Sequence, residues 1–587
     1  MKNVLRFMVI GLLVLAISML IAPISAQEGG EGGVLITDNI GDDVPTFNPL
    51  IASDTTSSLV YGWMYPSLYT IDLDTGQNAP NQPQAMATGW EYDETGTVMT
   101  IHMREDAYWN DGTQITSADW MWGAEAIWSG ETSSPRTSQF AELLDGTPAG
   151  GPIVDIEAPD DFTVVLTFEK PSCIALNEVF TPMVPAHIWE DLYGADYALM
   201  DEGARDIPTV TFGPFKDLEF EPGARVSLLA DQDYPDTQLG YVAPSEWVFL
   251  SIGSTDLAVE RFRAGDITHT TISPDYQEEF RGSADFQIYE YNDNGFSYLA
   301  FNNANPENPM AGMDEDGNLV EQDPHPVFGN VNVRVALTHA TDIDAIIDGL
   351  YGGNGTRIGT HTIPQSWTFN SELSRSYDPE LAAQMLDDAG WVIEEGSEWR
   401  VCRGCAYTEV DPEFEGSEMV FNITANEGND IRERMAQFTV SAWNELGVGA
   451  QYETLDWGSA FLPTLVGQTF DVVTLGWSLG LPDDGDMSWA YGPEADLPEA
   501  GFNFVSFFDA EFNELQDAQK DPMQTDGCDE EIRKGMIARS QEILYEQQPY
   551  IYLLNTNVMY ALQSNIEGFS PKAYSRIWNI DAWTVND

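Results

Sequence analysis

The stretch F-D-V-V-T-L-G-W-S-L-G-L-P-D-D-G-D-M-S-W, residues 470–489, decides how the whole chain is interpreted. Asp471 to Leu475 is a short apolar run rich in β-branched residues, which predicts a buried strand ending at Gly476. A loop should then carry two tryptophans and three carboxylates: Trp477, Trp489, Asp483, Asp484 and Asp486. Because ligands of open α/β sheets lie beyond the carboxyl ends of strands, we expect a small-molecule site here.

The same stretch contains G-x-S-x-G, the pattern of the serine hydrolase nucleophile elbow, at residues 476–480. That elbow requires a helix directly after Ser478, whereas Pro482 and the Asp-Asp-Gly that follows it favour a turn. The hydrolase histidine must also follow the serine, and the last histidine of this chain is His361. We therefore expect a strand followed by a turn at this position. We also expect that the protein is not an enzyme, and a secreted hydrolase with Ser478 as its nucleophile is the disfavoured alternative.

The N-terminus has the organisation of a secretory signal. A basic start at residues 1–6 precedes an apolar run at residues 7–21, and Ala22-Pro-Ile-Ser-Ala26 supplies a small-residue cleavage site. No cysteine lies near the cut, so we expect no lipid anchor, and no later segment is apolar enough to span a bilayer. The predicted location is periplasmic or extracellular.

The chain is strongly acidic. Among its 587 residues, 24 Lys plus Arg stand against 96 Asp plus Glu, which gives a net charge of −72. Such a surface repels phosphate backbones and anionic membranes, so nucleic acid is excluded as a partner. The charge fits either an ordinary solvated surface or adaptation to high salt, and composition does not separate the two.

Four cysteines are present: Cys173, Cys402, Cys405 and Cys528. Cys402 and Cys405 form a C-x-x-C, but a zinc site needs a second ligand pair and none is near in sequence. In an oxidising compartment a local disulfide is the favoured interpretation. Cys173 and Cys528 are expected either to pair with each other or to stay buried, and no metal or cofactor is expected.

Periodicity predicts a mixture of strands and helices. Strands are expected at residues 34–36, 98–104, 163–168, 226–230, 296–302 and 550–554, and helices at residues 117–128, 256–264, 331–340 and 342–350. Another helix should begin at Asp378-Pro379, a cap followed by a first-turn proline, and stop at Gly390. These elements indicate α/β lobes.

Several motifs follow one another along the chain. Trp109-Asn-Asp-Gly112, Val184-Pro-Ala-His-Ile-Trp189, Gly213-Pro-Phe215, Arg334-Val-Ala-Leu337, Tyr377-Asp-Pro379 and Phe508-Asp-Ala-Glu-Phe512 occur in this order. Together they resemble the extracytoplasmic solute-binding proteins of ABC importers, family 5, which includes dipeptide- and oligopeptide-binding proteins. The resemblance covers nearly all of the chain after the signal segment.

The resemblance implies an α/β fold, a periplasmic-binding-protein-like type II clamshell of two lobes with an extra domain inserted in the first lobe. The implied segments are residues 1–26 (signal peptide), 27–70 (lobe I), 71–210 (inserted domain), 211–293 (lobe I), 294–552 (lobe II) and 553–587 (lobe I). A ligand then closes the lobes around itself, and the closed protein, expected to be a monomer, docks on the importer permease.

The resemblance also suggests how a ligand is held. Peptide binders of this family hold the ligand amine with an Asp three residues after the tryptophan aligned with Trp477, but Gly480 occupies that position here. Asp483 or Asp484 is a possible replacement, because a carboxylate is the natural partner of an ammonium group. The alternative is a neutral or oligosaccharide ligand stacked on Trp477 or Trp489.

Two first-lobe residues, Asp54 and Thr55, align loosely with cleft-facing positions of the family. The expected function is thus capture of a peptide or a peptide-sized solute for an ABC importer. A chaperone or sensor that uses the same clamshell without an importer is the third alternative.

Overall fold

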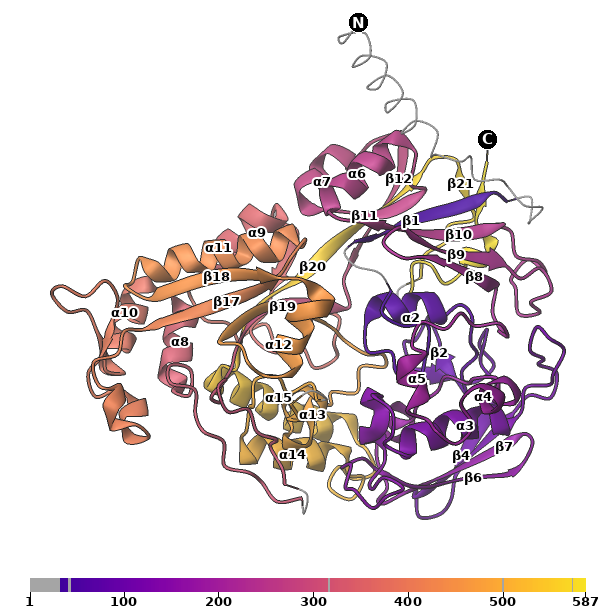
Figure 1. Cartoon of the computed structure of the whole chain (residues 1–587), viewed down its shortest axis with the longest axis horizontal. Helices are drawn as coiled ribbons and strands as arrows, with labels where there is room; N and C mark the ends of the chain where they lie inside the picture. Colours follow the sequence, from indigo (N-terminus) through magenta and orange to yellow (C-terminus); the bar gives the residue numbers. More distant parts are fainter. Residues whose placement is uncertain (1–31, 41–43, 315–316, 499–500, 573, 587) are drawn as a thin grey trace, which may run out of the picture.

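The computed structural model describes residues 32–40, 44–314, 317–498, 501–572 and 574–586 (Figure 1). The predicted signal segment, residues 1–26, lies outside this part of the chain. Within it, no helix combines the length and the apolar character needed to cross a membrane.

Two four-stranded sheets are built mainly from the N-terminal half of the chain. One has the order β1–β10–β9–β8, with bounds Val34–Ile40, Glu246–Ile252, Arg225–Ala230 and Phe215–Glu221. The other is antiparallel and has the order β4–β5–β7–β6, with bounds Ala87–Tyr92, Val98–Met103, Thr163–Phe168 and Ile153–Asp160. Both sheets contribute to one hydrophobic core, which also includes Trp583 near the C-terminus.

The largest sheet has eight strands. Its main path is β11–β20–β13–β19–β17–β18, with bounds His269–Ile272, Tyr550–Gln563, Gly295–Phe301, Val472–Ser478, Val420–Asn426 and Gly449–Leu455. Two further strands, β12 (Phe286–Asn292) and β14 (Gly355–Arg357), also pair with β20. Helices lie beside these sheets (Figure 1).

The α-helices have the following bounds: α2 Thr55–Tyr61, α3 Ser117–Trp128, α4 Ala186–Tyr193, α5 Leu199–Glu202, α6 Thr255–Ala264, α7 Pro274–Phe280, α8 Val331–His339, α9 Ile343–Tyr351, α10 Pro379–Asp388, α11 Asp430–Asn444, α12 Leu462–Val466, α13 Ser488–Tyr491, α14 Ala510–Lys520 and α15 Glu530–Gln547. The short strands are β2 Thr70–Ile71, β3 Asn78–Ala79, β15 Trp391–Val392, β16 Val401–Cys402, β21 Ile566–Glu567 and β22 Thr584–Val585.

The predicted caps are present, since Thr116 precedes α3 in a capping box and the Asp378 side chain accepts from Leu381 N.

Strand β20 belongs to both halves of the molecule. Its first residues, Tyr550 to Leu554, pair with β13, and residues 554–556 pair with β14. From Asn557 onward it pairs with β12, and from Met559 also with β11. The sequence predicted a strand only at residues 550–554, so the second half of β20 was missed.

The hydrophobic side chains divide into two sets on either side of this crossing. In the described residues, each core cluster takes its members either from residues 35–291 together with residues 559–585, or from residues 296–554. A domain is organised around its own core. The predicted two-lobe α/β architecture therefore holds. We call the first set lobe I and the second set lobe II. The predicted residue boundaries and the inserted domain stay predictions.

The predicted end of the strand before Trp477 was wrong. Strand β19 does not stop at Gly476 but continues to Ser478, because β13 lies beside it and pairs Phe296 with Trp477 and Gly295 with Ser478. Trp477 therefore lies in a strand and not in the loop after it.

Both disulfides are formed. Cys402 pairs with Cys405, as expected, and both side chains are buried beside the β15–β16 hairpin. Cys173 pairs with Cys528 across 355 residues of sequence, which resolves the alternative left open above. This second bond joins a segment of lobe I to a segment of lobe II.

Arg334 on α8 holds the end of α15 in place within lobe II. Its guanidinium is buried and donates to the carbonyl oxygens of Phe328, Gln547 and Gln548 at 2.5–3.2 Å. Replacing it with methionine (Arg334→Met) keeps the apolar stem but leaves these carbonyls without a donor. We expect the free energy of unfolding, measured by chemical denaturation, to fall by about 3 kcal/mol.

The matched control is Arg403→Met. Arg403 is exposed and pairs with Glu394 at 2.7 Å, so its loss should leave the free energy of unfolding nearly unchanged. If both variants lose the same free energy of unfolding, the buried hydrogen bonds of Arg334 contribute no more than the exposed ion pair of Arg403.

Candidate functional site

An aromatic cluster surrounds Trp477. We use this name for Trp477, Trp489, Phe502, Phe504 and Tyr298. The Trp477 ring stacks on Phe504 at 5.4 Å and on Tyr298 at 6.2 Å, and it is perpendicular to Trp489 at 5.0 Å. Trp477, Trp489 and Phe502 are only partly buried. Together the rings offer a rigid apolar surface on which a ligand's side chain or sugar ring can pack.

Within the described part of the chain, Ser478 forms no hydrogen bond with a histidine. Ser478 is exposed at the end of β19, and the next helix, α13, begins only at Ser488, so no helix directly follows the serine. His361 packs against Trp489, and its Nδ1 lies 3.1 Å from the Tyr491 hydroxyl. Burial lowers the pKa of His361 to about 3, so its imidazole is neutral at physiological pH and serves as part of the core.

Arg432, on α11, lies close to the strand that carries Trp477. Its Nη1 donates to Asn426 Oδ1 at 2.8 Å, and a Cβ placed on Gly476 would lie 3.7 Å from its Nη2. Burial lowers the pKa of Arg432, opposed by the neighbouring hydroxyls of Tyr298 and Tyr351. Among the residues that the structure describes, no carboxylate forms an ion pair with this guanidinium. It is therefore placed to receive an anionic group from outside the protein.

The first turns of α11 also approach lobe I. Thr255 Oγ1, at the start of α6, donates to Asp430 Oδ2 at 3.3 Å, and Arg434 pairs with Asp275 of α7 at 2.8 Å. Arg432 thus lies on the side of lobe II that faces lobe I.

The loop with the predicted carboxylates lies against lobe I rather than beside Arg432. Asp484 Oδ2 accepts from Asn177 Nδ2 at 2.7 Å, and Asp484 Oδ1 accepts from Asp486 N at 2.9 Å. Asp483 is exposed, and its Oδ1 accepts from Gly485 N at 3.3 Å. The structure therefore brings Trp477 and Trp489 together in one place and Asp483 and Asp484 together in another.

Charged groups gather where this loop meets lobe I. We call this region the rim contact: Cys173, Asn177 and Glu178 of lobe I, with Asp484, Asp486, Lys520 and Cys528 of lobe II. Burial and the Asp486 charge raise the pKa of Asp484 to about 7. Burial opposes the charge on Lys520, but Asp486 and Glu178 outweigh it and raise the pKa of Lys520. The rim contact is a desolvated cluster in which carboxylates outnumber cations.

One cavity borders the rim contact, and another lies elsewhere in lobe I. A cavity of about 180 Å³ lies at the rim contact and is lined by Tyr92, Cys173, Asn177, Asp483, Asp484 and Arg533, among others. A larger one of about 460 Å³ lies within lobe I, where Arg104 is already paired with Asp106 and Asp236. Trp477 and Trp489 line neither of them.

The lobe I candidates have local roles in the structure. Asp54 caps α2, because its Oδ1 accepts from Ser57 N at 2.8 Å, and Thr55 is the exposed first residue of that helix. In the described part of the chain, no hydrogen bond or ion pair links either residue to the aromatic cluster. Their role at a ligand site stays a prediction.

Sequence reasoning missed Arg432 and the lobe I side of the rim contact. Arg432 stands in a charged helical segment, Asp430-Ile-Arg-Glu-Arg434, that is typical of a solvated face. Asn177 and Glu178 are ordinary polar residues of a short 3₁₀ turn. Only the fold shows that Arg432 has no carboxylate partner in the described residues. Only the fold shows that Asn177 and Glu178 lie against the distant loop of Asp484.

Comparisons with known proteins agree with this architecture. The model of the family described as "Bacterial extracellular solute-binding proteins, family 5 Middle" matches residues 82–497. The oligopeptide-binding protein AppA of Bacillus subtilis is 24% identical over 574 residues, covering 95% of this chain and 93% of the relative.

Solved structures share the fold. AppA from Bacillus subtilis in complex with a nonapeptide matches with a TM-score of 0.76 at 20% identity, covering 95% of this chain and 100% of that one. NikZ from Campylobacter jejuni in complex with Ni(L-His) matches with a TM-score of 0.73 at 20% identity, covering 94% and 99%. At 20% identity, these two solved structures show that the two-lobe fold is shared.

The raised pKa of Asp484 predicts a pH dependence of stability. The group ionises near pH 4 when exposed and near pH 7 when folded, beside Asp486, Asp483 and Arg533. Its contribution to stability is therefore fully present below pH 4 and is lost as the pH rises to about 7. Relative to Asp484→Asn, the free energy of unfolding of the wild type should fall by up to about 1.4 kcal/mol per pH unit in this range.

Thermal and denaturant unfolding at several pH values measure this slope. Asp526→Asn, a change at an exposed position of the same lobe, should leave the slope as in the wild type. Identical slopes for the wild type and Asp484→Asn would show that the carboxyl does not titrate in this way.

Proposed function

The chain belongs to the family of bacterial extracellular solute-binding proteins, family 5, and we propose that it captures a peptide or peptide-sized solute and delivers it to an ABC importer. The two lobes would close on the ligand, and the closed form would dock on the permease. The relative AppA is named an oligopeptide-binding protein, and its solved structure holds a nonapeptide, which supports a peptide as the ligand class.

The observation that carries this proposal is the way the lobes are joined. They have separate cores, and two adjacent segments connect them, namely β20 and the short link between β12 and β13. Two bodies with few connecting segments can rotate relative to each other while each keeps its own packing. A ligand that contacts both bodies shifts the population toward the closed arrangement.

The ligand chemistry follows from the aromatic cluster and from Arg432, which faces lobe I. The aromatic cluster suits apolar or planar parts of a ligand, and Arg432 suits a carboxylate. A peptide carries both kinds of group. We assign the ligand's carboxylate to Arg432 and one of its side chains to the surface of Trp477 and Trp489.

A ligand ammonium group would need a carboxylate of the protein as its partner. Asp483 and Asp484 remain the proposed carboxylates, but an ammonium at Asp484 would have to replace its bond from Asn177. Asp54 and Thr55 are proposed to approach the ligand from lobe I. An oligosaccharide would use the same aromatic surface without Arg432, and the experiments below distinguish it.

Binding without chemical conversion is the proposed activity. The exposed Ser478 without a following helix, and the neutral His361 held by Tyr491, support this over hydrolysis. We propose that the protein acts as a monomer outside the cytoplasm, in keeping with the extracellular family to which it belongs.

Titration of intrinsic tryptophan fluorescence tests the proposal. We expect a saturable change with peptides of two to about nine residues, no change with oligosaccharides, and no product in the mixture. Trp477→Phe should reduce the amplitude, whereas Trp128→Phe should not, because Trp128 stacks on Phe140 in lobe I. A flat response to the whole panel would contradict the proposal, and a response to oligosaccharides alone would replace the peptide with a sugar.

Arg432→Met tests the carboxylate assignment. A charged hydrogen bond contributes about 1.5–3 kcal/mol, so peptides with a free carboxylate should bind about 10- to 100-fold more weakly. The same peptides with an amidated C-terminus should bind the variant and the wild type with similar affinity.

The matched control is Arg539→Met, because Arg539 pairs with Glu511 on the exposed side of α15 and should not affect affinity. Equal losses for free and amidated peptides would mean that Arg432 supports the site without contacting the carboxylate.

A further inference from the structure

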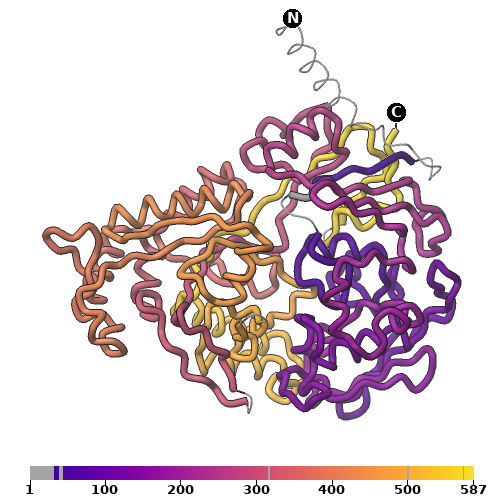
Figure 2. Tube along the Cα trace, viewed as in Figure 1, coloured from indigo at the N-terminus to yellow at the C-terminus, as the bar shows by residue number. Residues whose placement is uncertain are grey.

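The Cys173–Cys528 disulfide connects the two lobes at a distance from their hinge. In Figure 1, β20 crosses between the lobes in the upper part of the view, whereas α14 and α15 lie at the bottom, beside lobe I. The tube in Figure 2 shows the same separation. Cys528 lies in the connection between α14 and α15, and Cys173 follows β7. A covalent bond in this place limits rotation of the lobes about β20.

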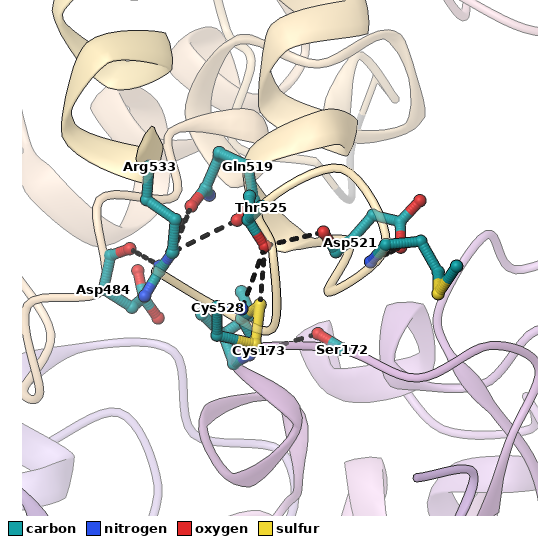
Figure 3. The surroundings of a disulfide bond; sticks show 10 residues. Ser172, Cys173, Asp484, Gln519, Asp521, Thr525, Cys528 and Arg533 are labelled. Carbon is teal, nitrogen blue, oxygen red and sulfur yellow. Dashed lines mark hydrogen bonds between the residues drawn. A yellow bond between two sulfur atoms is a disulfide. The ribbon is translucent and has the colours of Figure 1, made fainter. Parts of the chain in front are cut away.

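Hydrogen bonds accompany the disulfide across the rim contact. Cys173 N donates to Lys520 O at 2.8 Å, and Thr525 Oγ1 lies 3.5 Å from Cys173 Sγ (Figure 3). Thr525 also holds the loop of Cys528, because its Oγ1 accepts from Cys528 N at 3.2 Å and donates to Asp521 O at 2.7 Å. The bond therefore joins two segments that already fit together in this arrangement.

The loop that presents Cys528 has an unusual backbone. Asp526, Gly527 and Cys528 all have positive φ angles, of 49°, 81° and 69°. Side chains rarely adopt this region, and the loop needs neighbouring contacts to keep it. The contacts in question are those of Thr525 and of the disulfide itself.

The two disulfides differ in accessibility. Cys402 and Cys405 are 0% and 1% exposed, whereas Cys173 and Cys528 are both partly exposed, and Cys173 lines the 180 Å³ cavity. Reduction requires a thiolate to reach a sulfur atom. A thiol reductant should therefore reach the bond between the lobes long before it reaches the local one.

We propose that the Cys173–Cys528 disulfide is a redox latch that holds the lobes in the closed arrangement, so that a thiol reductant outside the cytoplasm controls the exchange of the bound solute. This inference rests on the proposed closure of the lobes. A thiolate of the reductant attacks one sulfur and forms a mixed disulfide, and the other cysteine leaves as a thiolate and takes up a proton. A second thiol of the reductant resolves the mixed disulfide, leaving two cysteine thiols and an oxidised reductant.

The remaining rim contact is suited to opening once the bond is broken. Glu178, Asp484 and Asp486 are desolvated carboxylates, and the cations whose charges reach them are Lys170, Lys520 and Arg533. Separation of the lobes rehydrates these carboxylates, which favours the open form. The covalent bond opposes this by keeping the segments at high effective concentration.

Small-angle X-ray scattering of the ligand-free protein tests the latch. The samples are the oxidised wild type, the wild type treated with dithiothreitol, and the variants Cys173→Ser/Cys528→Ser and Cys402→Ser/Cys405→Ser. We expect a larger radius of gyration for the reduced wild type and for the first variant than for the oxidised wild type and the second variant. Alkylation and mass spectrometry identify the cysteines that were reduced.

Binding kinetics of a peptide from the panel above give a second measurement. Because association requires the open form, the rate should rise about tenfold or more when the bond is removed. Equal radii and equal rates in all four samples would overturn the latch, and the reduced wild type excludes a folding defect of the serine variant as the cause. If the radii differ but no sample binds a peptide, the latch stands and the proposed function fails. If peptides bind but the radii and the association rates are equal, the proposed function stands and the latch fails.

Discussion

A single strand shared by two hydrophobic cores is the constraint on which the rest of the structure depends. Residues of β20 up to and including Thr556 pair with strands of lobe II, and residues from Asn557 onward pair with strands of lobe I. Its main-chain hydrogen bonds keep the two lobes in register along one line, and the described residues of the two lobes share no common core, which suits the proposed rotation about that line. Arg432 lies on the side of lobe II that faces lobe I, and the strand that carries Trp477 lies beside it.

The extreme acidity of the chain makes its unpaired cations informative. With 96 carboxylates for 24 Lys and Arg, ion-pair partners are plentiful, and nine of the described arginines pair with a carboxylate. Arg334 instead binds main-chain carbonyls at the end of α15, which serves stability. Arg432 has no equivalent set of acceptors, since its only described side-chain partner is Asn426. A buried charge without a partner is costly, and a ligand carboxylate would relieve that cost.

The sequence predicted the features that depend on neighbouring residues. Helices α3 and α10 were placed by their caps and periodicity, and the Cys402–Cys405 bond by its spacing. Features that depend on distant partners were missed or left open. The continuation of β19 through Trp477 requires β13, and the pairing of Cys173 with Cys528 requires the lobes to meet. The family resemblance supplied the two-lobe order, which no local pattern contains, but it did not reveal the positions of Arg432 or Asn177.

The most direct test of the account is to determine structures of the ligand-saturated and ligand-free protein with the disulfide between the lobes removed. The account predicts that each lobe keeps its own packing while the backbone turns near residues 292–295 and 554–557, and that the ligand lies against Trp477 with its anionic group at Arg432. A ligand bound elsewhere, or two structures with the same arrangement of the lobes, would contradict it.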